Sequence, residues 1–195
     1  HMGVNAGVYM LQFIAETYDD AYAKALHSLV HSYHGHGFNI NFDGKYMGPL
    51  TMNLGVLRIN SNSQSALIDI RVPDGMDSKT VFKNIEKSID TYDMTMDIDT
   101  DKPQVFLDPE GDMIKILEGV YREHTGDQQS PLITMGGGTY AKAFENHVAY
   151  GMEFPLEVKP SIVGDIHSAD EAISRKALVD GTAIYAEAIV KLCNM

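Results

Sequence analysis

The chain has 195 residues and a formal net charge of −12, because 27 acidic residues outnumber 15 scattered basic ones. Nucleic acid is excluded as a partner, since phosphate contacts need clustered lysine and arginine. Hydrophobic residues make up 44% and charged residues 22%, as in soluble globular proteins. No apolar run approaches the roughly 18 residues of a membrane span, and no signal-peptide pattern is present, so we expect a cytoplasmic protein without membrane contact. The single cysteine, Cys193, excludes an intramolecular disulfide and a thiolate metal site.

The first two residues, His1 and Met2, are typical of a cloning remnant, because a native chain does not begin with histidine before methionine. The apolar spacing of a helix follows almost at once, without a strand or a cap before it. We therefore interpret the sequence as starting inside a longer protein.

A long amphipathic helix is predicted over residues 4–32, because apolar side chains recur there close to the helical period. A break is expected near Asp19 and Asp20. Gly35 and Gly37 end the helix, since glycine is favoured just behind a helix C-terminus.

Extended segments follow. Residues 38–42 and 48–59 have the composition of strands, with a turn at residues 43–44 between them. Residues 65–72 alternate between apolar and polar side chains, as a strand with one buried face does. This strand is expected to pair with residues 52–59 through a tight turn.

A helix at residues 78–89 and a strand at residues 94–98 complete the first half of the chain. The predicted order is a long helix followed by two strands, a helix and a further strand. This order predicts an α+β sandwich.

A second unit is expected after Lys102 and Pro103. Its predicted elements are helices at residues 112–124, 139–146 and 169–192 and short strands at 131–135 and 148–150. Alternating helices and short apolar strands favour α/β layering over a helical bundle.

His167 is the sharpest candidate for chemistry. It lies just before a predicted helix start, with Ser168 as the expected cap, so its ring can face solvent or a metal ion. An ordinary loop histidine is the competing interpretation. Zinc needs three or four ligands, so His167 cannot form a site alone.

Three consecutive glycines, Gly136, Gly137 and Gly138, precede Thr139. Without Cβ atoms their amides can approach an anion closely, next to the positive end of a following helix. A tight strand-to-helix turn would use the same residues. The segment lacks the lysine and hydroxyl ending of a nucleotide P-loop, which argues against ATP.

Arg71 lies on the polar face of the predicted strand, next to Asp69. Its guanidinium suits bidentate capture of a substrate carboxylate. A solvated salt bridge with Asp69 is the favoured interpretation of Arg71 from the sequence alone, and the same caution applies to Asn53.

A histidine cluster spans the end of the first predicted helix. His27 and His31 are one turn apart, and His34 and His36 follow. The spacing permits metal binding, but no carboxylate completes a zinc motif, so surface histidines at a helix end are the favoured interpretation.

Four segments together resemble the bacterial Xaa-His dipeptidase and carnosinase-like branch of the di-zinc metallopeptidases. They are residues 47–55, 68–75, 136–142 and 166–171. In that family a lid domain interrupts a catalytic domain that both chain ends supply. The resemblance implies that residues 3–103 are the later part of a ferredoxin-like lid and residues 104–195 the C-terminal part of the α/β catalytic domain.

The same resemblance implies roles for individual residues. His167 corresponds to the C-terminal zinc ligand and Arg71 to the lid arginine that grips the carboxylate of a dipeptide. Gly136, Gly137, Gly138 and Thr139 correspond to the loop that lines the pocket of that carboxylate.

Several parts of the family's active site have no counterpart in the sequence. These are the N-terminal His-x-Asp ligand segment, the bridging aspartate, the Glu-Glu pair with the general base, and a lid histidine expected just upstream of Gly3. We therefore expect a partial zinc site, an inactive fragment, and self-association through a sheet edge and a helix face left uncovered. The alternative is a non-catalytic binding or oligomerisation module derived from a dipeptidase.

Overall fold

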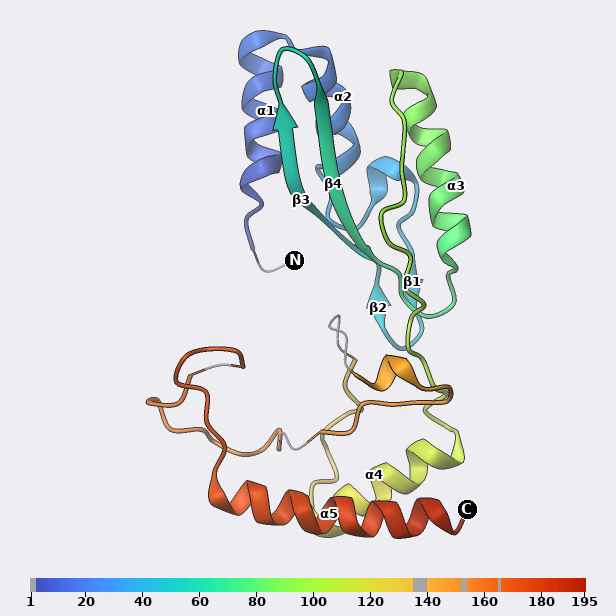
Figure 1. The fold of residues 1–195 in the computed structure, drawn as a ribbon, viewed down its shortest axis with the longest axis vertical. Coiled ribbons are helices and arrows are strands. Elements are labelled where there is room, and N and C mark those ends of the chain that lie inside the picture. Colours follow the sequence, from blue (N-terminus) through green and yellow to red (C-terminus); the bar gives the residue numbers. More distant parts are fainter. Residues whose placement is uncertain (1–2, 135–139, 152–153, 165) are drawn as a thin grey trace. The chain divides into compact units, whose positions relative to one another are not determined.

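The computed structural model describes residues 3–134, 140–151, 154–164 and 166–195. The chain separates into two compact units, His1–Gln104 and Val105–Met195. Figure 1 shows the course of each, and the units are described one at a time.

The predicted long helix consists of two helices, α1 (Ala6–Tyr18) and α2 (Ala21–Val30). Asp19 adopts the left-handed conformation with φ 57°, which ends α1, and the Asp20 side chain accepts a hydrogen bond from Ala23 N–H at 2.8 Å to begin α2. The expected break is therefore confirmed. The expectation of an uncapped start was wrong, because Asn5 Oδ1 accepts from Val8 N–H at 3.2 Å.

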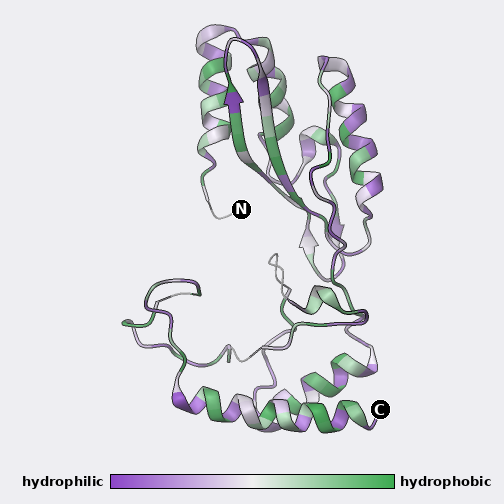
Figure 2. Ribbon diagram, in the orientation of Figure 1, coloured by the Kyte–Doolittle hydropathy of each residue, from purple (hydrophilic) through white to green (hydrophobic). Residues whose placement is uncertain are grey.

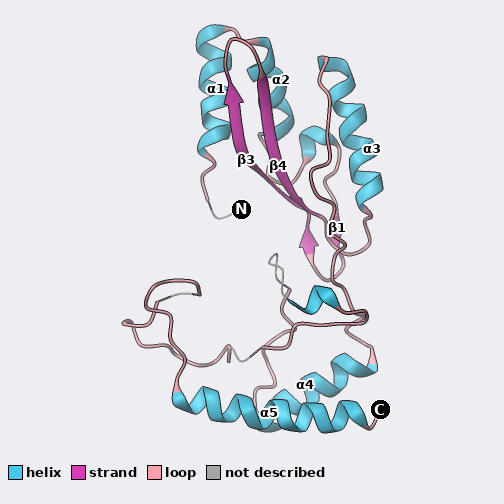
Figure 3. Cartoon of the chain, in the orientation of Figure 1, coloured by secondary structure: helices cyan, strands magenta, loops and turns pink. Residues whose placement is uncertain are grey.

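The longer of the two strand pairs described in the first unit is antiparallel and consists of β3 (Thr51–Ile59) and β4 (Gln64–Arg71), as the sequence predicts. The pairing runs from Thr51 opposite Arg71 to Ile59 opposite Gln64, with a bulge at Gly55. Asn60 Oδ1 closes the turn by accepting from Ser63 N–H at 3.0 Å. Figure 3 shows the two strands side by side.

The region before β3 differs from the prediction. Phe38 ends a 3₁₀ helix, η1 (His36–Phe38), and the expected turn at Asp43–Gly44 is itself a short strand, β1, paired with β2 (Gly48–Pro49). Gly37 permits a close approach, because a Cβ there would collide with the carbonyl of Leu29 at the end of α2. Close packing against α2 thus prevents an extended conformation at this point.

The carboxylate of Asp74 holds the β1–β2 hairpin in place. It is 6% exposed and accepts from the N–H groups of Met47 at 2.7 Å and Tyr46 at 3.1 Å. Burial opposes ionisation, but these backbone donors outweigh it and lower the pKa of Asp74 below its ordinary value.

Helix α3 (Ser78–Ile89) lies where the sequence predicts it and leads into η2 (Asp90–Tyr92). Asp77 caps it through Thr80 N–H at 2.8 Å. The strand predicted at residues 94–98 is not formed, because these residues pair with no other backbone group among the residues described. Met94 and Met96 still pack against the core.

The core of the first unit lies between the three helices and the inward face of β3 and β4. Its most completely buried side chains are Leu11, Ile40, Leu50 and Val81. Full burial of each aliphatic side chain stabilises the fold by about 1.5–3 kcal/mol. Figure 2 shows hydrophobic residues along both strands and alternating with hydrophilic ones around α3.

The second unit is built on α4 (Asp112–Thr125) and α5 (Arg175–Cys193). Their contact contains Leu117, Val120, Ile184 and Ala188. Tyrosine hydroxyls connect the intervening segment to both helices: Tyr150 donates to the Leu117 carbonyl at 2.9 Å, and Tyr185 donates to the Tyr150 carbonyl at 2.7 Å.

Several expectations for this unit were wrong. Residues 131–134 and 148–150 form no strand, and within residues 140–146 only a 3₁₀ turn, η3 (Tyr140–Ala143), is present. Helix α5 begins at Arg175 rather than near Ala169, because Ser174, not Ser168, caps it through Ala177 N–H at 2.9 Å. The described part of this unit is therefore helical, without the α/β layering, while the chain as a whole is of mixed α+β type.

Among the helices in the described ranges, none combines the length and the apolar character that crossing a bilayer requires.

Candidate functional site

In the first unit, the candidate site lies on the face of the β3–β4 sheet that points away from the core. Thr51 stands opposite Arg71 and Asn53 opposite Asp69, so four polar side chains share this face at one end of the hairpin. The intervening residues Met52 and Ile70 point inward. The alternation predicted for β4 therefore places Arg71 where the sequence expects it.

The ion pair between Arg71 and Asp69 is loose. Arg71 Nε lies 3.5 Å from Asp69 Oδ1, and the two side chains are 56% and 67% exposed. An exposed pair at this distance contributes little to stability. Both terminal guanidinium nitrogens of Arg71 lack a protein partner among the described residues, which leaves the two-pronged donor available for a planar carboxylate.

Asn5 fixes the neighbouring Asn53. The Asn5 side-chain amide donates to Asn53 Oδ1 at 2.7 Å and to the Leu54 carbonyl at 2.9 Å, while Asn5 Oδ1 caps α1. The Asn53 oxygen is thereby occupied, and its NH₂ group is held on the same sheet face as Arg71. Sequence reasoning missed Asn5, although an asparagine directly before a helix is a capping signal.

In the second unit, His167 lies in a closed loop. Its N–H donates to Glu171 Oε2 at 2.9 Å, and the Gly164 N–H donates to the Asp170 carbonyl at 3.2 Å across the loop. A Cβ at Gly164 would collide with the side chains of Asp170 and Ser168. Glycine at position 164 therefore allows the loop to close around His167.

The backbone of His167 is left-handed, with φ 68°. This conformation costs a residue with a Cβ about 1–2 kcal/mol, and such residues concentrate at functional sites. The residue is exposed, and neither ring nitrogen is hydrogen-bonded within the described ranges. The imidazole is thus free to bind a ligand.

As a metal ligand, His167 fits by its donor type, because neutral imidazole is a preferred zinc ligand. The residues that the structure describes contain no group of three or more His, Cys, Asp or Glu able to hold a metal ion. Any metal bound by His167 would need its remaining ligands from elsewhere.

The histidines near the end of α2 do not converge on a metal site. The rings of His27 and His31 lie 6.2 Å apart between centroids. His34 Nδ1 contacts the Leu50 carbonyl at 2.9 Å, and His36 Nδ1 contacts Ser32 Oγ at 2.8 Å. These rings serve local packing and hydrogen bonding.

The predicted glycine loop is not part of the described site, because Gly136, Gly137, Gly138 and Thr139 lie outside the described residues.

Among the described residues of the second unit, the carboxyl group with the most strongly shifted pKa has a structural role. Asp127, 3% exposed, accepts from the N–H groups of Ser130 and Gln129 and from the Tyr121 hydroxyl. Hydrogen bonds from Ser130 are the main reason why the pKa of Asp127 lies far below its usual range. These donors organise the turn after α4, so this carboxylate is a poor candidate for catalysis.

Comparisons with known proteins cover nearly the whole chain. The family model for peptidase family M20/M25/M40 matches residues 5–191. A "putative dipeptidase" of Staphylococcus aureus strain MRSA252 is 32% identical over 199 residues, which cover 98% of this chain and 41% of that protein. Proteins of the same description in strains USA300 and NCTC 8325 / PS 47 have the same identity and coverage. The chain thus spans less than half the length of these relatives.

Proposed function

Because the chain belongs to peptidase family M20/M25/M40, we propose that the intact protein is a zinc-dependent dipeptidase. The observation that carries this proposal is the 32% identity to proteins described as dipeptidases, which extends over 98% of the chain. Residues 3–103 would form the later part of a lid and residues 104–195 the C-terminal part of the catalytic domain.

In this proposal Arg71 binds the free carboxylate of the dipeptide. Support comes from its place on the polar sheet face, its exposed guanidinium and its loose pairing with Asp69 at 3.5 Å. Asn53, held by Asn5, supplies a second donor on that face. Gly136, Gly137, Gly138 and Thr139 are proposed to line the same carboxylate pocket, on the resemblance of their sequence alone.

His167 is proposed as a zinc ligand. Its exposed ring without a hydrogen-bond partner in the described ranges, and the loop that fixes its backbone, support this role. Zinc, when bound, polarises the scissile carbonyl and lowers the pKa of a bound water. The other ligands and the general base would come from polypeptide outside these 195 residues, so we expect the 195-residue chain alone to bind zinc weakly and hydrolyse no dipeptide.

Metal content of the intact protein tests the proposal without relying on activity. We expect His167→Ala to lower the zinc content per protein, measured after dialysis against a fixed free zinc concentration. His31→Ala, at the end of α2, is the matched control and should retain the full content. Equal zinc content in both variants would refute the assignment of His167.

Measuring the turnover of dipeptides tests the proposed dipeptidase activity. The intact protein should release amino acids from a dipeptide panel at about 1 per second or faster with its best substrate. The 195-residue chain should release none above background. An intact protein with bound zinc and no turnover on any dipeptide would instead favour a binding module.

A further inference from the structure

Helix α3 carries a line of lysines on the side that faces away from the core. Its buried residues recur at intervals of four: Val81, Ile85 and Ile89. Three exposed lysines follow the same interval, two residues out of step: Lys79, Lys83 and Lys87. Two residues correspond to about 200° around a helix, so these lysines, which we call the lysine stripe, lie opposite the buried face.

The lysine stripe has no acidic partner within the described ranges. Lys24, Lys115 and Lys176, which are equally exposed to solvent, each form an ion pair. A shortage of carboxylates is not the reason, because 27 acidic residues are available to 15 basic ones. Like charges four residues apart on a helix repel each other. The stripe therefore places a repulsion on α3 that a bound anion would relieve.

The carboxylates at the start of α3 are already engaged elsewhere. Asp77 accepts hydrogen bonds from the N–H and the hydroxyl of Thr80, both at 2.8 Å. Asp101 accepts a hydrogen bond from Ser78 Oγ at 3.0 Å. Neither carboxylate forms an ion pair with a lysine of the stripe among the described residues.

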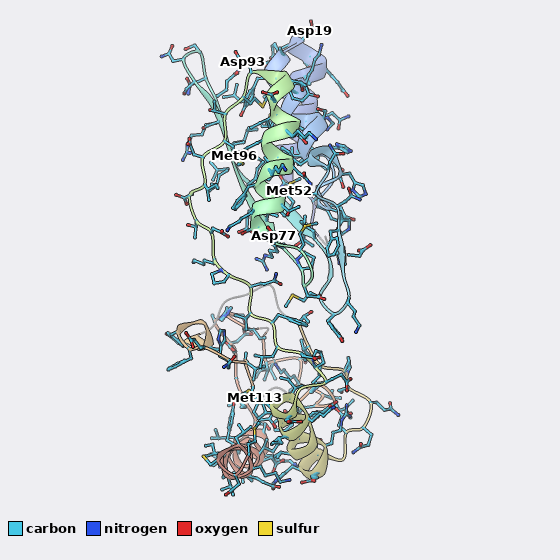
Figure 4. The ribbon with its side chains drawn as sticks, turned by 90° about the vertical axis from the view of Figure 1, so that its right-hand side faces the viewer. Asp19, Met52, Asp77, Asp93, Met96 and Met113 are labelled. Atoms are coloured by element: carbon cyan, nitrogen blue, oxygen red, sulfur yellow. The ribbon has the colours of Figure 1, made fainter. Side chains whose placement is uncertain are left out.

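The outer side of α3 is open in the first unit. Figure 4 views this unit from the side of α3 and shows the helix in front, between Asp77 and Asp93. Figure 1 shows the same helix at the margin of the unit, with no other described segment of the unit beyond it. A ligand can therefore reach the lysine stripe.

The spacing of the stripe matches that of an extended peptide. Lysines four residues apart on a helix are separated by about 6 Å along its axis. In an extended chain, side chains two residues apart point to the same side and are separated by about 6.6 Å. A segment with a carboxylate at every second residue can therefore place one carboxylate beside each lysine.

We propose that the lysine stripe of α3 is a docking site for an acidic segment of a partner protein, bound in an extended conformation with a carboxylate at every second residue. Complementary charge selects the partner, and the regular spacing sets its register on the helix. The proposal concerns α3 alone and does not depend on the proposed peptidase activity.

Acidic residues beside the stripe favour a narrow ligand over a broad anionic surface. Glu86 and Asp90 are exposed on α3, three residues beyond Lys83 and Lys87, and Asp93 follows the helix. A membrane or a nucleic acid would bring its phosphates against these carboxylates as well, and like charges repel. An extended peptide chain contacts the stripe alone.

A second copy of the chain is the competing occupant. Asp97, Asp99 and Asp101 are exposed and alternate in the sequence, as the proposed segment does. However, Asp101 is held by Ser78 of its own copy, and a net charge of −12 on each copy opposes association. A different protein with a short acidic segment meets neither obstacle.

Fluorescence anisotropy with the intact protein tests the proposal. The probe is a labelled seven-residue peptide in which aspartate and threonine alternate, beginning and ending with aspartate. Binding should weaken about tenfold or more between about 50 and about 300 mM salt, because salt screens exposed charges. A peptide with asparagine in place of aspartate should not bind. If the acidic peptide failed to bind at low salt, the proposal would be wrong.

A second peptide tests the extended register. It has the same composition, but its four aspartates stand in one block, so that fewer carboxylates point to one side of an extended chain. It should bind about threefold more weakly or worse. Equal binding of the two peptides would overturn the proposed register.

Two triple variants locate the binding. The first combines three changes on the stripe: Lys79→Gln, Lys83→Gln and Lys87→Gln. It should weaken peptide binding about tenfold or more, while glutamine keeps a helix propensity close to that of lysine. The matched control removes the same charge from lysines that have acidic partners: Lys24→Gln, Lys115→Gln and Lys176→Gln. Equal weakening by both variants would show that net charge, and not the stripe, determines binding.

The kind of occupant is tested by two further measurements on the intact protein. Light scattering should show no dimer that depends on the stripe. A salt-sensitive dimer that the stripe variant abolishes would replace the partner protein by a second copy. Vesicles of anionic phosphatidylglycerol should not compete with the peptide. Competition that the stripe variant abolishes would overturn the proposal in favour of a membrane surface.

Discussion

Arg71 Nε lies 3.5 Å from Asp69 Oδ1 on the outward face of β4, and the terminal guanidinium nitrogens of Arg71 have no protein partner among the described residues. An arginine held this loosely can exchange its carboxylate partner for a ligand at little cost. The alternation of β4 places the Arg71 side chain on this face, and its two-pronged end is available to a ligand.

Replacing Arg71 by lysine in the intact protein should lower kcat/KM for free dipeptides about ten- to a hundredfold. Lysine keeps the charge but loses the bidentate geometry, and one charge-assisted hydrogen bond is worth roughly 1.5–3 kcal/mol. Steady-state kinetics with free and C-terminally amidated dipeptides measure the effect, because the amidated substrates lack the carboxylate and should respond little.

Arg58→Lys is the matched control, since Arg58 is another exposed arginine of the same sheet. It should leave kinetics on both substrates unchanged. If Arg71→Lys reduced efficiency equally on free and amidated substrates, Arg71 would be a structural strand residue rather than a carboxylate ligand.

Gly164→Ala should weaken zinc binding in the intact protein by roughly tenfold, although Gly164 donates no ligand. The added methyl group would collide with Asp170 and Ser168 and open the loop that positions His167. Zinc affinity from competition with a chelator dye measures the change. Gly119→Ala in α4 is the control, because a Cβ there meets no atom within 4 Å. An unchanged affinity for Gly164→Ala would show that the loop does not position the ligand.

The contact between α4 and α5 should lose stability in acid. Lys191 and His124 donate to Glu187 and lower its pKa to about 2, from an ordinary value of 4.5. A carboxyl whose folded pKa is depressed stabilises the fold above its unfolded pKa, and this stability is lost as the pH falls through the folded value. The window here is pH 4.5 to about 2.

Glu187→Gln should therefore speed amide exchange in α5 at pH 6 and reduce the dependence of that exchange on pH below 4.5. The exposed pair of Lys176 and Asp180, at the start of the same helix, provides the control Asp180→Asn. A Glu187→Gln profile that keeps the acid dependence of the wild type would contradict this account.

Local sequence signals predicted much of the first unit. Helix α3 and the β3–β4 hairpin follow from side-chain periodicity and turn residues, and Asp19 and Asp20 marked the break between α1 and α2. Residues 94–98 have the same kind of signal and form no strand, because a strand also requires a partner, which periodicity cannot supply.

The second unit shows more clearly which features could not be predicted from the sequence. Ser168 and Ser174 are both plausible caps by residue type, and only the fold decides that Ser174 begins α5. The position of Arg71 on an outward sheet face could be predicted from alternation. The left-handed backbone of His167 could not, because it depends on the hydrogen bond to Glu171 and on the space that Gly164 leaves.

Asp74→Asn should destabilise the first unit and lower its Tm by several degrees at pH 7. The ionised carboxylate of Asp74 accepts hydrogen bonds from the N–H groups of Tyr46 and Met47. The neutral amide of an asparagine would accept these bonds more weakly, and its NH₂ group would add two buried N–H donors without partners. Because the folded pKa of Asp74 lies below its ordinary value of 3.8, the wild type should lose this stability only as the pH falls below that value. Thermal unfolding of both proteins from pH 7 to pH 2 measures the difference in Tm between them, which should shrink in acid.

Asp43→Asn, at an exposed position of the same hairpin, is the control and should leave Tm unchanged. If the Asp74→Asn penalty were the same at pH 2 and pH 7, the charge of Asp74 would not be the source of its effect.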